Sequence, residues 1–184
     1  MRFTPDRELE IISGATTPTL NVASDSDHIF FIADDDTLYR VPWQGQVVPE
    51  PYFHFPKLKE SIQGISVTSH YIFVTCAHDI ARLCKAGHLQ TWLRNFNGKP
   101  MHLRATESRV YWLGRKHYLD EKPKLIDASP QTQACPWTVY ERDGVSIAGL
   151  ALVDEDLWWL EEDLRPRLAP LGRICKLAGG GRTE

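Results

Sequence analysis

An acidic triplet, Asp34-Asp35-Asp36, carries the carboxylate oxygens that calcium and magnesium prefer as ligands. It lacks the alternating acidic positions and the distal Glu of an EF-hand loop. The seven histidines show no HxH, HxxxH or HExxH spacing, so the sequence indicates no local zinc site. We therefore predict neither a metal site nor a bound cofactor.

Cys76 and His78 lie two positions apart and could supply a nucleophile and its base. A cysteine at the end of an apolar strand is more often a small buried hydrophobe, which we expect here. Gly179-Gly180-Gly181 opens no helix and does not indicate a phosphate-binding loop. The four cysteines have no CxxC spacing, so we expect reduced thiols and no disulfide between Cys84 and Cys175.

Six tryptophans could stack on sugar rings or pack a core. Trp112, Trp158 and Trp159 occupy positions of the repeat described below, so we expect them to be packing residues. Trp43 and Trp137 each follow a proline and are candidates for surface binding.

The composition describes a folded, single-domain chain. Its 184 residues are 42% hydrophobic and 24% charged, enough apolar surface for a core, which excludes a disordered chain. A net charge of −3 argues against binding to nucleic acid. The longest apolar run, Ile147–Val153, is far shorter than the roughly 20 residues of a membrane span. No apolar signal segment stands at the N-terminus, so we expect a cytoplasmic protein.

Four aromatic or apolar segments repeat along the chain. Their central residues Phe30, Phe73, Tyr111 and Trp158 are separated by 43, 38 and 47 positions. Eight positions before each of them stands an aliphatic residue, and polar residues fill the positions three and four before it. Each unit therefore predicts a strand, a tight polar turn and a second strand.

A third strand is predicted after each hairpin, at 39–45, 82–87, 124–126 and 173–176. Outer fourth strands are predicted at 47–53, 89–93 and 137–141. The basic residues Arg40, Arg82 and Arg173 recur in the third strands, where we expect hydrogen bonds between units rather than an anion site.

The last unit has no fourth strand of its own, and residues 8–12 could supply one. Four such units predict a single all-β domain over residues 1–184, folded as a four-bladed β-propeller with four-stranded antiparallel blades. The blades are expected at about 18–55, 64–96, 99–142 and 147–178, with the N-terminal strand 8–12 closing the last one.

The apolar runs favour this architecture, because a blade packs on both faces and its inner strands need not alternate with polar residues. A helix over 154–168 is the local alternative, since Leu157, Leu160, Leu164 and Leu168 have helical spacing.

The units resemble propeller repeats of the Y-W-T-D class and related bacterial propellers, over roughly residues 8–178. Val110-Tyr111-Trp112 carries the likeness best, together with the third-strand pattern that ends at Gly. The Thr-Asp that completes the motif is absent from all four units, so the resemblance implies a fold and no ligand or calcium site.

The loops between second and third strands would share one face of a propeller, a face that often binds ligands. We therefore predict a non-catalytic protein that recognises a protein or peptide partner through this loop rim. The candidate binding residues are Asp34, Asp35, Asp36, His78, Asp79, Arg115, His117, Trp43 and Trp137.

Two other functions stay open from the sequence. One is sequestration of a sugar, nucleotide or other small polar ligand in the central channel. The other is an enzyme whose site is assembled across blades. We expect a monomer or a homodimer, because two chains could also combine through the N-terminal strand. We expect it to bind neither nucleic acid nor membrane.

Overall fold

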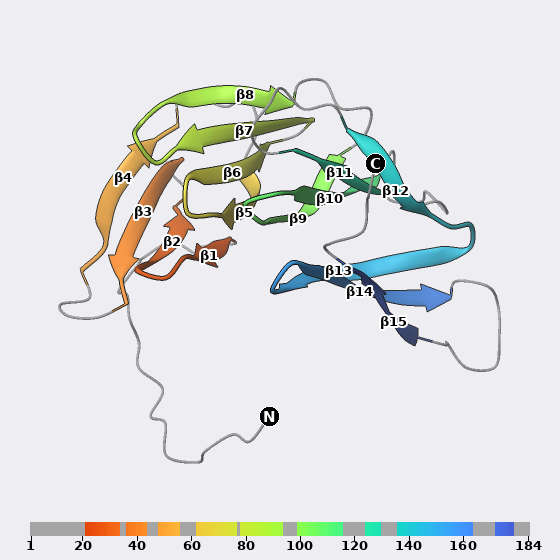
Figure 1. Ribbon diagram of the computed structural model, residues 1–184. Coiled ribbons are helices and arrows are strands. Elements are labelled where there is room, and N and C mark those ends of the chain that lie inside the picture. Colours follow the sequence, from red (N-terminus) through yellow and green to blue (C-terminus); the bar gives the residue numbers. More distant parts are fainter. Residues whose placement is uncertain are drawn as a thin grey trace, which may run out of the picture.

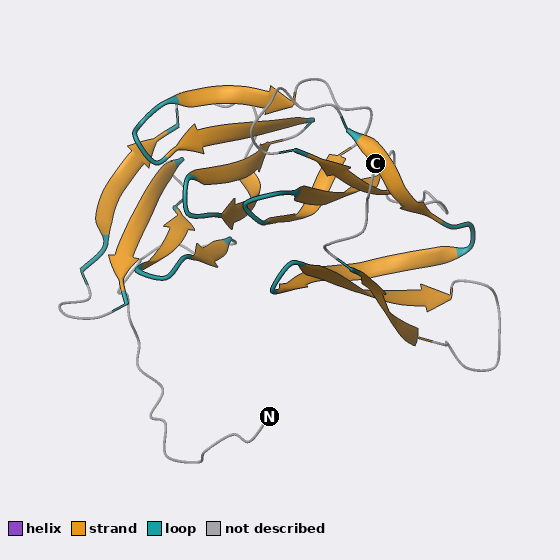
Figure 2. Ribbon diagram, in the orientation of Figure 1, coloured by secondary structure: helices purple, strands orange, loops and turns teal. Residues whose placement is uncertain are grey.

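The computed structural model describes residues 21–33, 36–43, 48–55, 62–76, 78–93, 99–115, 124–129, 136–163 and 172–178. Every regular element in these ranges is a β-strand (Figure 2). No helix long and apolar enough to cross a membrane occurs in the described ranges.

The fifteen strands form four antiparallel sheets, three with four strands and the last with three. The first sheet contains β1 (Val22–Ser24), β2 (His28–Ile32), β3 (Thr37–Pro42) and β4 (Glu50–His54). The second contains β5 (Ile62–Val67), β6 (Tyr71–Cys76), β7 (Asp79–Cys84) and β8 (Leu89–Leu93). The third contains β9 (Lys99–Ala105), β10 (Val110–Arg115), β11 (Lys124–Ala128) and β12 (Trp137–Glu141). The fourth contains β13 (Val145–Val153), β14 (Asp156–Asp163) and β15 (Gly172–Leu177).

These sheets confirm the all-β, four-bladed architecture, with strands paired in chain order. The predicted outer strands at 89–93 and 137–141 coincide with β8 and β12, and β4 begins three residues later than expected. The helix considered over 154–168 is excluded where the structure describes it, because Asp156–Asp163 is strand β14. The predicted closing strand 8–12 lies outside the described residues.

The apolar runs form strands that are buried on both faces. All residues of β6 except Tyr71 are buried. Successive side chains of a strand point to opposite faces of its sheet. Accordingly Phe73 packs toward the third sheet, whereas Ile72 and Val74 pack toward the first.

Each interface between neighbouring sheets repeats this arrangement. Phe30 joins the cluster between sheets one and two, Phe73 the next, and Tyr111 the cluster between sheets three and four. The repeat residue therefore faces the following sheet in each case. Its neighbours along the strand face the preceding sheet, as Leu157 and Trp159 do in the fourth sheet.

Polar contacts join neighbouring sheets at their turns. Lys85 Nζ lies 2.5 Å from a carboxylate oxygen of Asp25, and the backbone N–H of Ser69 donates to Glu107. Between the third and fourth sheets, the Ser108 hydroxyl donates to Glu155 at 2.9 Å. Each of the three interfaces thus has a polar link between turns.

The sheets follow one another around an arc that is open between its first and last members (Figure 1). Each hydrophobic cluster of the described residues joins two sheets that are consecutive in the chain. None of these clusters combines residues of the first sheet with residues of the fourth. The described sheets consequently have two outward faces, one at each end of the arc.

Candidate functional site

The predicted loop rim is described in part. Asp36 has a left-handed backbone with φ of 58°, and its N–H donates to the carbonyl of Ala33. Its own carbonyl accepts the N–H of Phe55. Asp36 therefore shapes the turn between β2 and β3. Asp34, Asp35 and His117 lie outside the described residues, as does the side chain of Arg115 at the end of β10.

His78 lies in the equivalent turn of the second sheet, between β6 and β7, and Asp79 begins β7. The His78 side chain is exposed, and the buried Cys76 thiol lies 3.8 Å from the carbonyl of Asp79. Cys76 is therefore the small buried residue that the sequence predicted. The described part of the chain holds no group of three His, Cys, Asp or Glu able to bind a metal ion.

Glu161, in β14 of the fourth sheet, is only 1% exposed. Its carboxylate accepts hydrogen bonds from the Tyr140 hydroxyl and Arg173 Nε, and Arg142 Nη1 lies 3.4 Å away. Burial, reinforced by the Glu161 carboxylate, raises the pKa of Tyr140. Because its oxygens are used in these contacts, Glu161 links the third and fourth sheets and offers little to a ligand.

The two tryptophans proposed for surface binding differ. Trp43 is 52% exposed, and its indole N–H donates to the carbonyl of Asp25 at 2.9 Å. Trp137 is half-buried in β12, with the Arg109 guanidinium 5.3 Å from its ring centre. Trp43 thus keeps an open aromatic face, whereas Arg109 covers part of Trp137.

Trp158 corrects the expectation that all repeat tryptophans pack in the core. Trp112 and Trp159 are buried, but Trp158 is only half-buried. It occupies the repeat position that faces a following sheet, and the described chain places no sheet there. Trp158 therefore points to the outward face of the fourth sheet.

The outward face of the fourth sheet is apolar and open to solvent. The register aligns Ala151 with Trp158 and Leu160 with Ile174, so these side chains share one face. Ile174 is 75% exposed and Leu160 is 45% exposed. Exposed aliphatic groups of this size, gathered on one surface, are typical of interaction sites.

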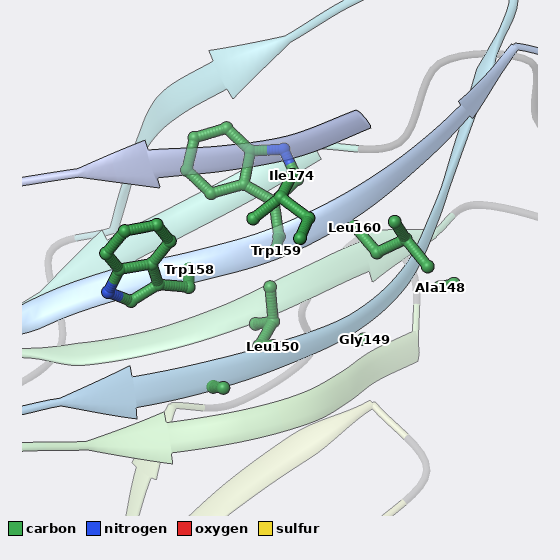
Figure 3. A pocket seen from close by; sticks show the side chains of 8 residues that line it. Ala148, Gly149, Leu150, Trp158, Trp159, Leu160 and Ile174 are labelled. Carbon is green, nitrogen blue, oxygen red and sulfur yellow. The ribbon is translucent and has the colours of Figure 1, made fainter. Parts of the chain in front are cut away.

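A shallow hollow of about 330 Å³ lies on this face, and Figure 3 shows its side chains projecting from neighbouring strands. Its lining consists of Ala148, Gly149, Leu150, Ala151, Trp158, Trp159, Leu160 and Ile174. Within the structure described, the buried indole N–H groups of Trp158 and Trp159 have no acceptor. A Cβ atom built at Gly149 would meet nothing within 4 Å, which shows how open the hollow is.

Charged groups border the hollow on one side. Lys176 Nζ lies 5.1 Å from the ring centre of Trp158 and 2.5 Å from a carboxylate oxygen of Asp156. This pair provides a polar edge beside an apolar centre. Protein interfaces commonly have this composition, with a buried apolar core and a solvated polar rim.

Sequence reasoning missed this face, although a signal for it was present. The repeat places Phe30, Phe73 and Tyr111 between sheets, and Trp158 is the fourth member of that series. A repeat residue that faces the next unit is left uncovered when no next unit follows it. Side chains alternate between the two faces of a sheet along each strand. Applying this alternation to β14 would have predicted that Trp158 faces away from the third sheet.

No family model matches this sequence, and no curated protein matches it. Solved structures match by fold. A chain of a nidogen–laminin complex aligns with a TM-score of 0.62 and 12% identity, covering 84% of this chain and 64% of that one. Streptogramin B lyase aligns with a TM-score of 0.56 and 14% identity, covering 86% of this chain and 53% of the lyase.

The computationally designed protein Ika4 aligns with a TM-score of 0.58 and 9% identity, covering 94% of this chain and 99% of the design. The nidogen and lyase matches are propeller-type folds, which supports the resemblance seen in the repeats. The chain spans less than two thirds of the nidogen–laminin chain and about half of the lyase. At these identities the likeness concerns the fold alone.

Proposed function

We propose that this protein is a non-catalytic, propeller-type binding scaffold that docks another protein surface on the outward face of its fourth sheet. The observation that supports the proposal is the exposed apolar face around Trp158, Leu160 and Ile174. Covering such a face removes apolar surface from water, which contributes roughly 25 cal/mol for each Å².

The shape and chemistry of the hollow favour a protein over a small molecule. Small-ligand sites usually enclose their ligand and place a few polar groups to orient it. This hollow is wide open, as the 75% exposure of Ile174 indicates, and its lining side chains are apolar except for two indole N–H groups that are themselves buried. A flat apolar partner surface suits it better than a sugar or nucleotide.

The loop rim remains a second, predicted surface for the same function. Asp36, His78 and Asp79 lie at one end of the first two sheets, where a partner could also bind. The exposed side chain of His78 makes it a suitable position from which to test the rim.

Photocrosslinking in the cells that make the protein tests the two surfaces against each other. A benzophenone side chain would replace Ile174 on the fourth sheet, His78 on the rim, or, as a control, Val48, which is 55% exposed and precedes β4. The proposal expects a crosslinked polypeptide from position 174 and background from position 48. A polypeptide captured from position 78 but not from 174 would move the binding site to the rim.

A further inference from the structure

The interfaces between sheets are assembled from two different halves. One half consists of the repeat residue and the side chains on the same face of its sheet, which face the following sheet, as Tyr111 does toward the fourth. The other half consists of the side chains on the opposite face, which face the preceding sheet, as Val110 and Trp112 do in the third. We call each such set of side chains a row. Each interface therefore pairs a forward half with a backward half.

The two ends of the arc carry one half each. The fourth sheet presents a forward half, with Trp158 in the repeat position and Leu160 paired with Ile174 on the same face. The first sheet presents a backward half, because Val22, Phe31 and Tyr39 share a row on the face opposite to Phe30. The rings of Phe31 and Tyr39 stack there, with centroids 5.4 Å apart.

Exposed apolar side chains concentrate on these two faces. Among the described residues, six large hydrophobic side chains are exposed. Four of them lie on the outward faces by register: Val22 on the first sheet and Val153, Leu160 and Ile174 on the fourth. Three of these four residues lie on the fourth sheet, which indicates that its outward face belongs to an interface. On the first sheet's outward face Val22 is exposed, whereas Phe31 is only 8% exposed.

We propose that the occupant of the fourth sheet's outward face is the first sheet of a second copy of this chain. The inference rests on the proposed function, because it names the partner of that same face. A two-fold arrangement makes two identical junctions, each joining a fourth sheet to the partner's first sheet. Two copies would place eight sheets in one closed ring, within the usual range of about 4–8 for propellers.

A second copy fits better than the chain's own first sheet. The three clusters pack each described sheet only against its neighbours in the chain. The arc of a single copy holds its ends apart (Figure 1). Contact within one copy would require these packed interfaces to rearrange, whereas a second copy can meet both ends without such a change.

Light scattering coupled to size-exclusion chromatography tests the dimer. The full chain is expected at twice its 21.0 kDa mass at micromolar concentration. Ile174→Lys and Val22→Lys each place a charge in both junctions, and each should weaken the dimer about tenfold or more. Val48→Lys, a position of similar exposure that precedes β4 and belongs to neither row of facing side chains, is the control and should leave the dimer intact. Circular dichroism confirms folding, which substitutions at such exposed positions rarely disturb.

Mixing the Ile174→Lys and Val22→Lys variants tests whether each junction joins a fourth sheet to a first sheet. In a mixed dimer one junction carries both lysines and the other carries neither, so the mixture should form more dimer than either variant alone. A folded monomer at every concentration would overturn the second-copy inference, even if position 174 still captures a different protein. A dimer that survives Ile174→Lys would also overturn it. A failure to capture any polypeptide at position 174, with position 78 active, would instead reject the proposed function.

Discussion

Buried hydroxyl groups in this protein differ in whether they find a partner. Thr75 Oγ1 is buried without a hydrogen-bond partner, beside the space left by the missing side chain of Gly64. Thr37 Oγ1, also buried, lies 3.1 Å from His54 Nδ1. The difference matters because a buried polar group costs free energy unless a hydrogen bond compensates it.

Thr75→Val should therefore raise the free energy of unfolding by about 1 kcal/mol, because valine removes the desolvated hydroxyl and keeps the shape. Thr37→Val is the matched control and should lower it by about 1 kcal/mol, because it breaks a hydrogen bond. Urea unfolding measures both. Equal effects of the same sign would contradict the distinction between the two hydroxyls.

A substitution at Gly149 should change the stability of the chain and its binding in opposite directions. A side chain there meets open space, and glycine in a strand interior is entropically costly. Gly149→Val should stabilise the isolated chain by about 0.5 kcal/mol and weaken docking on the fourth sheet, because it fills the hollow. Thermal unfolding and the crosslinking yield at position 174 check the two effects. An unchanged yield would place the contact elsewhere.

Asp25 gives the link between the first two sheets a pH dependence. Burial acts to raise the pKa of Asp25, but hydrogen bonds from Lys85 and from the N–H groups of Asp27 and His28 outweigh it and lower the pKa. A carboxylate with a lowered folded-state pKa adds stability above its unfolded value of about 3.9, and this is lost as pH falls through the folded value.

Asp25→Asn should lower the free energy of unfolding at pH 7 by about 1–2 kcal/mol, because it removes a charged partner of Lys85. The difference from the native chain should shrink as the pH falls below about 4. Urea midpoints measured across this range test the prediction. A difference that grows in acid would show that the ionised carboxylate does not stabilise the fold.

At the scale of elements, spacing and residue type were enough to predict most strands. The aromatic second strands and their polar turns recur every 38 to 47 residues, which is enough chain for one sheet built of consecutive hairpins. Irregularities of register were beyond prediction. Bulges interrupt the pairing of first and second strands in three sheets, at Ile62/Gly64, Tyr111/Leu113 and Ile147/Gly149. An extra residue in a strand has no fixed sequence pattern apart from a tendency toward glycine.

Gly64 shows why one bulge needs its glycine. A Cβ atom there would lie 2.9 Å from Thr75 Oγ1, closer than van der Waals contact permits. Gly64→Ala should lower the free energy of unfolding by about 1–3 kcal/mol, the usual cost of overpacking. Combining it with Thr75→Ala should recover part of that loss relative to Thr75→Ala alone, as a double-mutant cycle would reveal. Strict additivity would contradict the steric explanation.

The structure corrects part of a prediction about charge in the third strands. Arg40, Arg82 and Arg173 were expected to hydrogen-bond between units. Arg40 instead donates to Glu50 of its own sheet, and the Arg82 guanidinium lies over the Tyr71 ring. Arg173 donates to Glu161 and also hydrogen-bonds Tyr140 of the third sheet, as predicted. For Arg40 the local partner is nearer, because neighbouring strands in a sheet lie about 4.8 Å apart, whereas facing sheets lie about 10 Å apart.

At the scale of the whole molecule, the sequence predicted four sheets and could not predict that their arc stays open. Ring closure depends on small angles between packed sheets, and these follow from side-chain packing that periodicity does not encode. The candidate site depends on this same property. Trp158 is only half-buried and Ile174 is exposed because the described chain brings no fifth sheet against the fourth. The positions of Asp36, His78 and Asp79, by contrast, follow directly from strand order, and their part in a binding surface stays a prediction.

The most direct test of the account is hydroxyl-radical footprinting of the protein as isolated from its own cells, in its native assembly. Binding through the fourth sheet predicts that Ile174 and Leu160 react several-fold more slowly than Val48, although Ile174 is the most exposed of the three in the isolated chain. Ile174 reacting at least as fast as Val48, together with protection of His78, would contradict the account and place the binding surface on the loop rim.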